Sequence, residues 1–326
     1  MNIKYDGSEF FMNRSNIKTG YFCRLTVIDS TVIAGSESGE GLYYSEDNGH
    51  TWQRSDIKSG NFLCLTVIGS TVIAGGWSNK GLYYSTDNGH TWQRSNIQSG
   101  DFHSLTVIDS IVIAGSWSRK GLYYSEDNGK TWNQSNIQSG NFWCLTVINS
   151  TVIAGSDSDK GLYYSEDNGH TWNQSNISTG YFSCLTTIGS TVIAGSYDNG
   201  LYYSEDNGKT WNKSNIQSGR FFSLTVVGST VIAGSYDNGL YYSEDNGKTW
   251  NKSNISTGYF SCLTTIGSTV IAGSSSKKGL YYSEDNGKTW NRSNIRSGNF
   301  WCLTVINSTV IAGSDSDKGL YYSENC

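Results

Sequence analysis

The sequence predicts an all-β protein built from eight copies of one small antiparallel sheet. Glycine is abundant (38 residues), proline is absent and aromatic residues make up 13% of the chain. This composition is typical of many short strands joined by tight turns. A Gly-Leu-Tyr-Tyr-Ser motif also recurs every 39 or 40 residues, and this regularity overrides the expectation of two ordinary domains for 326 residues. The motif begins at Gly41, Gly81, Gly121, Gly161, Gly200, Gly239, Gly279 and Gly319.

Each copy is expected to contain four strands. In the fourth copy, the first strand is predicted at residues 142–148 and the second at 151–155. A loop over 156–160 leads to a third strand at 162–165, and a fourth strand is predicted at 171–176. The apolar runs of the first two strands do not alternate cleanly with polar residues, which indicates sheets covered on both faces. Neighbouring copies must therefore stack against one another.

An eight-residue segment joins the third and fourth strands, and in the third copy it runs from Ser125 to Trp132. Its Asn128-Gly129 pair is the strongest short-range signal of a hairpin, because both residues tolerate positive φ. The Asp127 carboxylate can accept hydrogen bonds from turn amides, and the Trp132 ring can pack on the neighbouring copy. We expect structural roles for the equivalent residues of seven copies: Asp47, Asp87, Asp127, Asp167, Asp206, Asp245 and Asp285, with Trp52, Trp92, Trp132, Trp172, Trp211, Trp250 and Trp290.

The two ends of the chain predict a closed ring. The eighth copy stops before its fourth strand, and residues 10–17 match the missing segment as it stands at 289–295. The first strand would then complete the last sheet (velcro closure) and remove exposed sheet edges. We expect one eight-bladed β-propeller over 1–326; seven blades with a loose unit, or a linear array, are the alternatives. The expected units are 13–52, 53–92, 93–132, 133–172, 173–211, 212–250, 251–290, and 291–326 with 10–17.

The repeated Ser-x-Asp-x-Gly-x-Thr-Trp pattern resembles the Asp-box, or BNR repeat, of sialidase-like, sortilin-like and photosystem II assembly-factor-like propellers. The resemblance implies the propeller fold. Sialidases, however, have six blades, an arginine triad, a Tyr–Glu pair and an Arg-Ile-Pro motif, and this sequence has no proline. Most arginines occupy one repeat position on the outer strand (Arg14, Arg54, Arg94 and Arg292). Such similar repeats leave little room for an asymmetric catalytic site, so we expect no enzyme activity.

Differences among the copies point to one face of the ring. In an antiparallel order, the loops that join blades lie on the same face as the loops between second and third strands. These loops and the start of the first strand vary from copy to copy, and rigid scaffolds commonly bind partners through variable loops. The candidate binding residues are Trp77, Trp117, Tyr197, Tyr236, His103, Trp143, Trp301 and Phe222. For Trp143, Trp301 and Phe222, filling the central channel is an equal alternative, whereas exposed Trp77 and Trp117 favour a contact role.

Three functions remain open. The first is a binding scaffold that recognises a protein or another macromolecule across the variable face. The second is a lectin-like module whose loop aromatics stack on sugars. The third is an amplified or constructed repeat protein with no native ligand, which the near-identity of residues 141–166 and 299–324 suggests.

Charge and cysteine content narrow the partners further. A net charge of −5 without a basic cluster disfavours nucleic acid and anionic membranes as partners.

Equivalent cysteines occupy a position that also accepts serine (Ser104 and Ser223), so we expect a small-residue slot and free thiols. Unpaired cysteines and the lack of an N-terminal signal favour a cytoplasmic location. We expect a monomer without cofactor or metal; the paired carboxylates at 157–159 and 315–317 are too few for calcium.

Overall fold

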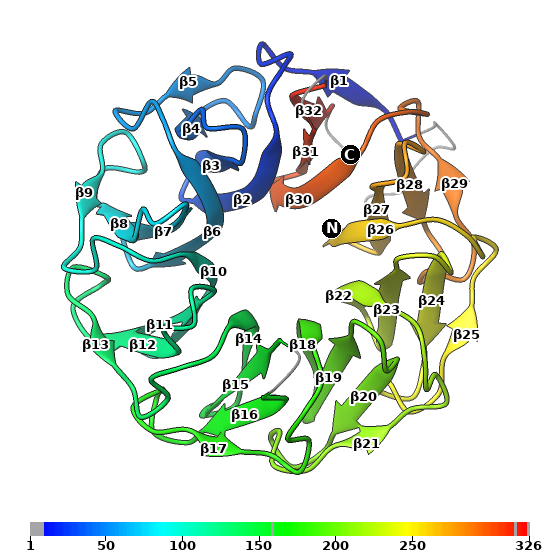
Figure 1. Ribbon diagram of the computed structural model, residues 1–326. Coiled ribbons are helices and arrows are strands. Elements are labelled where there is room, and N and C mark those ends of the chain that lie inside the picture. The colour runs from blue at the N-terminus through cyan, green and yellow to red at the C-terminus, as the bar shows by residue number, and fades with distance from the viewer. Residues whose placement is uncertain (1–9, 158–159, 316–317, 325–326) are drawn as a thin grey trace.

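The computed structural model describes residues 10–157, 160–315 and 318–324, which form eight four-stranded antiparallel sheets arranged in a ring (Figure 1). The predicted eight-bladed β-propeller is confirmed. We number the blades in chain order, so that blade 1 contains β2 to β5 and blade 8 contains β30 to β32 together with β1. No helix with the length and hydrophobicity needed to cross a membrane occurs within these three ranges.

The four strands of a blade lie side by side, in order from the central channel to the outer rim. The innermost strands are β2 (Phe22–Ile28), β6 (Asn61–Ile68), β10 (Phe102–Ile108), β14 (Phe142–Ile148), β18 (Phe182–Ile188), β22 (Phe221–Val227), β26 (Phe260–Ile266) and β30 (Phe300–Ile306). The second strands are β3 (Thr31–Ser36), β7 (Thr71–Trp77), β11 (Ile111–Ser116), β15 (Thr151–Ser156), β19 (Thr191–Ser196), β23 (Thr230–Ser235), β27 (Thr269–Ser274) and β31 (Thr309–Ser314).

The outer half of each blade is shorter. The third strands are β4 (Leu42–Ser45), β8 (Leu82–Ser85), β12 (Leu122–Ser125), β16 (Leu162–Ser165), β20 (Leu201–Ser204), β24 (Leu240–Ser243), β28 (Leu280–Ser283) and β32 (Leu320–Ser323). The rim strands are β1 (Met12–Arg14), β5 (Gln53–Arg54), β9 (Gln93–Arg94), β13 (Asn133–Gln134), β17 (Asn173–Gln174), β21 (Asn212–Lys213), β25 (Asn251–Lys252) and β29 (Asn291–Arg292).

Blade 4 shows how well the strand limits were predicted. The first and third strands match, and the second is one residue longer than expected. The fourth prediction, 171–176, was too long, because β17 contains two residues. Thr171 instead belongs to the turn, where its N–H and hydroxyl both donate to Asp167. After β17, the Ser175 hydroxyl accepts the Ile177 N–H and starts the next loop.

The innermost strands carry a bulge that directs side chains into the channel. In blade 4, Phe142 pairs with Ser156 and Cys144 pairs with Gly155, so Trp143 is the extra residue. The same register shift occurs in all eight blades. A bulge of this kind re-aims one side chain at a strand end. It therefore presents one variable residue per blade at the channel.

The hydrophobic core lies between adjacent blades rather than inside each blade. One cluster joins Ile73 and Leu82 of blade 2 to Phe102 and Trp132 of blade 3. The asparagine-glycine turn fits this contact: Gly129 has a φ of 82°, and a Cβ there would lie 2.6 Å from the Ile73 Cδ1 atom. The turn and the ring of Trp132 thus pack blade 3 on blade 2, which explains why both recur in the sequence.

The first described segment closes the ring, as predicted. Strand β1 pairs with β32, with Met12 opposite Ser323 (Figure 1). Phe10 and Met12 are buried in the cluster between blades 7 and 8. The Asn294 side chain accepts the Met12 N–H at 2.8 Å and donates to the Met12 carbonyl at 2.9 Å. Met12 therefore takes the place that a tryptophan holds at the other blade boundaries.

Candidate ligand-binding site

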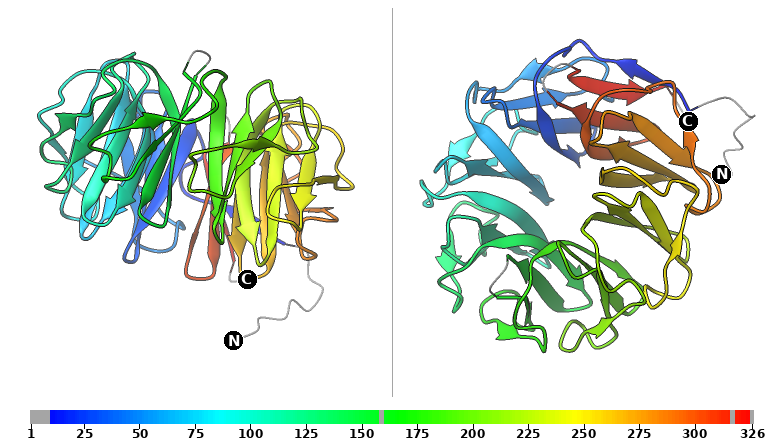
Figure 2. Two further views of the ribbon diagram at one scale, coloured as in Figure 1. Left: turned by 90° about the horizontal axis from the view of Figure 1, so that it is seen from below. Right: turned by 45° about the vertical axis from the view of Figure 1, so that its right-hand side comes forward.

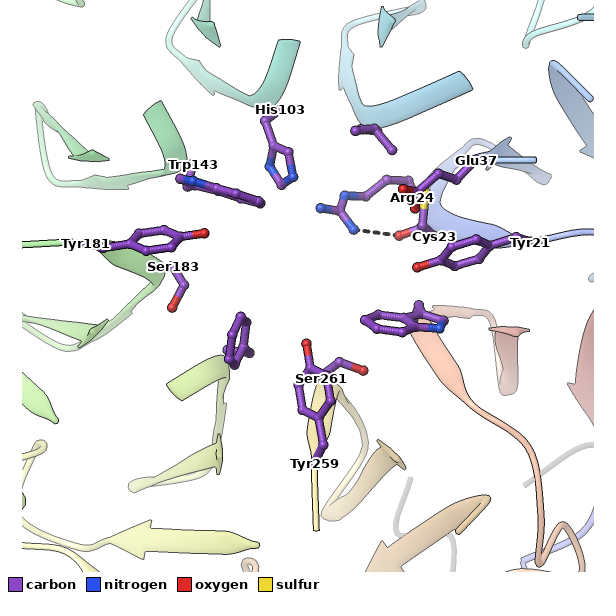
Figure 3. Close-up of a pocket in the computed structure, with 13 residues that line it drawn as sticks. Tyr21, Cys23, Arg24, Glu37, His103, Trp143, Tyr181, Ser183, Tyr259 and Ser261 are labelled. Atoms are coloured by element: carbon purple, nitrogen blue, oxygen red, sulfur yellow. Dashed lines mark hydrogen bonds between the residues drawn. The ribbon is translucent and has the colours of Figure 1, made fainter. Parts of the chain in front are cut away.

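The ring has two faces, and the connecting segments gather at the two ends of the strands (Figure 2). The loops that enter the innermost strands share one face with the loops between second and third strands, and we call this the loop face. A cavity of about 270 Å³ opens at the channel mouth on this side and is lined by Tyr21 and Glu37, among other residues (Figure 3). A second cavity of about 370 Å³ continues along the channel between leucines of the innermost strands.

Nine aromatic rings from all eight blades form a nearly continuous arc around the mouth, which we call the aromatic collar. Each ring contacts the next, with consecutive centroids 4.6 to 6.1 Å apart. Such separations are favourable for ring pairs. In order around the channel, the collar consists of Trp77, Trp117, Trp143, Tyr181, Tyr197, Phe222, Tyr259, Trp301 and Tyr21. Its two ends lie on neighbouring blades 1 and 2.

The structure brings all eight candidate residues together at this mouth. Four of them line the 270 Å³ cavity: His103, Trp143, Phe222 and Trp301. Of the other four, Trp117, Tyr197 and Tyr236 contact these rings from farther out, and Trp77 contacts Trp117.

The expectation that Trp77 and Trp117 are exposed was wrong, although Trp117 does lie in the loop after β11, as expected. Both are partly buried, and Trp77 ends strand β7. Their ring centroids lie 6.1 Å apart, and the Trp117 ring packs edge-on against Trp143 at 4.6 Å. Tyr236, in contrast, is 37% exposed. The two tryptophans thus shape the rim of the mouth together.

Arg24 reaches the mouth because blade 1 departs from the other blades. The residue after the bulge of each innermost strand normally sits in a tight slot between blades, as Cys64 does, where its Sγ atom would clash with a Cβ placed on Gly75. A guanidinium cannot fit there. In blade 1 the preceding residue, Cys23, is buried instead and its thiol faces the carbonyl of Phe62 at 3.7 Å. Arg24 consequently lines both cavities, and Figure 3 shows its guanidinium extending into the mouth.

The Arg24 guanidinium has no carboxylate partner within 4 Å among the described residues. Its one hydrogen bond goes to the carbonyl of Cys23, at 2.7 Å. Glu37 is the other charged residue of the cavity wall, and its carboxylate, after burial, helps to raise the pKa of Tyr21. The mouth therefore holds one positive and one negative group that do not form an ion pair.

The remaining titratable groups of the cavity are uncharged near neutral pH. Burial, and then the positive charge of Arg24, lower the pKa of His103 to about 3. Burial is also the main reason why the pKa values of Tyr21, Tyr181 and Tyr259 are raised. These tyrosines keep their protons and can donate hydrogen bonds. Arg24 and Glu37 thus dominate the electrostatics of the mouth.

The cysteine slot has the predicted small-residue character. Cys64 and Ser104 occupy equivalent positions and donate to the carbonyls of Phe102 and Phe142 in the next blade. Six cysteines are free and buried, as expected, and burial raises the pKa of Cys64 to about 12. Cys326 lies outside the described residues. No cluster of three or more potential metal ligands occurs in the described ranges, and the 157–159 and 315–317 segments fall partly outside them.

The opposite face, formed by the Asp-box turns, is internally paired. In the third copy, Asp127 accepts hydrogen bonds from Ser125 Oγ (2.9 Å), Thr131 N (2.8 Å) and Thr131 Oγ1 (2.6 Å). Lysines of the later copies bind glutamates of the preceding blade, as Lys209 binds Glu166 at 2.7 Å. The predicted structural role of Asp127 is thereby accounted for, and its carboxylate is occupied by the turn.

Sequence reasoning missed the polar half of the mouth. Arg24, Glu37, Tyr21, Tyr181 and Tyr259 were visible as positions that differ among copies, but they were not chosen as candidates. The available signal was the arginine in a position that is otherwise cysteine or serine.

Comparison with known proteins supports the fold. The BNR/Asp-box repeat model matches six segments: residues 43–54, 83–94, 123–134, 202–213, 241–252 and 281–292. The unmatched copy that ends at Trp172 has the same turn hydrogen bonds. No curated protein sequence matches the chain.

Solved structures share the architecture at low sequence identity. The computationally designed Ika8 protein has a TM-score of 0.75 at 12% identity, covering 97% of this chain and 99% of that one. BamB from Moraxella catarrhalis has a TM-score of 0.65 at 13% identity, with coverages of 97% and 96%. YCF48 bound to D1 peptide has a TM-score of 0.62 at 16% identity, with coverages of 99% and 96%. At such identities the similarity concerns the fold alone. The chain is thus an eight-bladed β-propeller that carries six segments matching the BNR/Asp-box repeat.

Proposed function

We propose that the chain is a non-enzymatic binding scaffold that recognises a segment of a protein partner at the mouth of its central channel. The observation that carries this proposal is the aromatic collar around a cavity whose arginine has no acidic partner within 4 Å in the part of the chain that the structure describes. Aromatic residues and arginine are the residue types that dominate binding hot spots. A rigid ring that presents them costs little ordering entropy on binding.

The two faces differ in the way that this proposal requires. Several charges on the Asp-box face form ion pairs within the molecule, as in Lys248–Glu205 and Lys288–Glu244. On the loop face, Arg220 pairs with Asp237 at 4.0 Å, whereas the Arg24 guanidinium has, among the described residues, a hydrogen bond to a backbone carbonyl and no carboxylate within 4 Å. Among the fold neighbours, YCF48 was solved with a bound D1 peptide, which makes a peptide a reasonable occupant for a propeller of this shape.

The chemistry of the mouth also supports a binding role over catalysis. A general base works best with a pKa near the operating pH, whereas the pKa of His103 is about 3. Burial raises the pKa values of the Tyr181 and Tyr259 hydroxyls, away from neutral pH. Asp127 and its equivalents hold turns on the other face, away from the cavity.

A peptide display library panned against the purified protein tests the proposal. We expect enriched peptides whose affinity falls at least tenfold in the Trp77→Ala/Trp117→Ala variant and stays unchanged in His170→Ala, which removes a ring from the opposite face. Enriched peptides that bind the double variant as well as the wild type would contradict the placement of the site.

A glycan array run in parallel separates the lectin-like alternative. Saturable glycan binding that depends on Trp77 and Trp117, without any enriched peptide, would replace the peptide proposal. The absence of both peptide and glycan ligands would leave the repeat scaffold without a native ligand as the better description.

A further inference from the structure

The position of Arg24 specifies the chemistry of the partner segment. In seven blades, a cysteine or serine at the position equivalent to Arg24 fills the slot between blades. In blade 1, the preceding residue Cys23 fills the slot instead, so that the Arg24 side chain enters the channel. A charge that is partly withdrawn from water is costly unless an opposite charge accompanies it. Within the described residues, Arg24 has no such companion inside 4 Å, and its single hydrogen bond leaves most of its five N–H donors available.

The surroundings of Arg24 add two further restrictions. The guanidinium shares its cavity with Tyr21, His103 and Trp301, and several rings of the collar line the cavity wall. Its volume, about 270 Å³, lies just below the roughly 300–1,000 Å³ typical of small-molecule pockets. The mouth itself therefore has room for about one amino-acid residue, and the 370 Å³ cavity that continues along the channel leaves further space beyond it.

The neutral groups nearby strengthen the preference for an anion. His103, with a pKa of about 3, adds no second positive charge, so the cavity attracts anions through one point only. The hydroxyls of Tyr181 and Tyr259 keep their protons and can donate to an acceptor oxygen. Glu37 disfavours a second negative charge on the side of Tyr21 and can accept an N–H instead.

We infer that the mouth binds a peptide through one carboxylate, which pairs with Arg24 while the adjoining apolar or aromatic side chain lies against the collar. This inference rests on the proposed function and specifies its partner as an acidic peptide. The guanidinium fork matches the two oxygens of a carboxylate. The carboxylate belongs either to the last residue of the peptide or to a glutamate or aspartate side chain.

Three short peptides distinguish these two sources. Acetyl-Ala-Phe with a free carboxyl end carries a terminal carboxylate, its amide carries none, and acetyl-Glu-Phe-amide carries a side-chain carboxylate. Binding is followed through the fluorescence of the collar tryptophans in titrations at two salt concentrations. We expect at least one carboxylate peptide to saturate, to bind about tenfold or more tightly than the neutral amide, and to weaken as salt rises.

Variants of two arginines provide the decisive comparison. Arg24→Gln should lose the preference for the carboxylate, by about 10- to 100-fold, and Arg24→Ser should do the same with the residue that blade 3 has at this position. Arg119→Gln removes the same charge from an exposed site on the same face and should bind like the wild type. Both Arg24 variants keep the cysteine slot filled by Cys23, so circular dichroism should confirm an intact fold.

Two results would overturn the inference. One is the lack of a saturable response to either carboxylate peptide; the other is an Arg24→Gln variant that binds them as the wild type does. If library peptides still bind at the collar in either case, the proposed scaffold function stands and only its acidic specificity fails. If no library peptide binds at all, the proposed function fails with it.

Discussion

Adjacent blades are tied together by an asparagine side chain, and the exception at Asp56 allows the value of one such tie to be measured. Asn96, which follows blade 2, accepts the Trp132 N–H of blade 3 at 2.8 Å and donates to the Trp132 carbonyl at 3.1 Å. At the boundary between blades 1 and 2, Asp56 accepts the Trp92 N–H at 3.1 Å. An ionised carboxylate has no hydrogen to donate, so this boundary lacks the second bond.

Substituting Asp56 and Asn96 separately should change the free energy of unfolding in opposite directions. Asp56→Asn adds one neutral hydrogen bond to the Trp92 carbonyl, which should stabilise the protein by about 0.5–1.5 kcal/mol. Asn96→Asp removes the equivalent bond and places a carboxylate beside the Trp132 carbonyl, which should cost about 1–3 kcal/mol. The effects concern different boundaries and different tryptophans, so the double variant should lie near the sum.

Urea unfolding followed by tryptophan fluorescence measures both changes. Midpoints should move in opposite directions while the slope with denaturant stays constant, because the surface exposed on unfolding is unchanged. Asn133→Asp, on the exposed rim strand β13, introduces the same charge away from a boundary and should have little effect. If Asp56→Asn does not raise the midpoint, or if Asn96→Asp behaves like the control, the tie contributes nothing and the reasoning is wrong.

Three further predictions concern the turns, the closure and the cysteine slot. Burial alone would raise the pKa of Asp127, but hydrogen bonds from Thr131 and Ser125 outweigh it and hold that pKa below its ordinary value of 3.8; the ionised form therefore stabilises the fold above this value. This contribution should disappear as the pH falls below about 4 through the lowered pKa, and Asp127→Ala, costing about 1–3 kcal/mol at pH 7, should show a flatter acid dependence of unfolding than the wild type. Deleting residues 1–17 removes β1 and exposes the edge of β32, so light scattering should detect oligomers or aggregates; a monodisperse and equally stable monomer would contradict closure by this strand. Cys64→Ser should unfold within about 1 kcal/mol of the wild type, because Ser104 and Ser223 make the same bond to the next blade, and a much larger loss would show that the slot requires sulfur.

The fold was predictable because each level of the sequence points to the same architecture. The repeat gives the number of blades, and Asn128-Gly129 gives the turn, with φ values of 59° and 82° in the structure. The match between residues 10–17 and 289–295 gives the closure. The short rim strand was overestimated, because a run of polar residues does not reveal that Thr171 is already used by the turn.

The site was predictable only in part. Rings at the start of the innermost strands could be placed at the channel from their variation among copies. The polar half of the mouth could not, because it depends on which of two neighbouring residues enters the slot between blades. The sequence Cys23-Arg24 does not by itself say that the thiol enters the slot between blades and the guanidinium enters the channel. That outcome follows from the close approach of the slot to Gly35 and Phe62, which only the three-dimensional structure reveals.

Hydrogen–deuterium exchange with and without a library-selected peptide tests the binding site most directly. The account predicts slower exchange at the loops around Trp77, Trp117 and Tyr236 on the loop face, with no change at the Asp-box turns. Slower exchange confined to the Asp-box turns, such as the segment from Ser125 to Trp132, would contradict it.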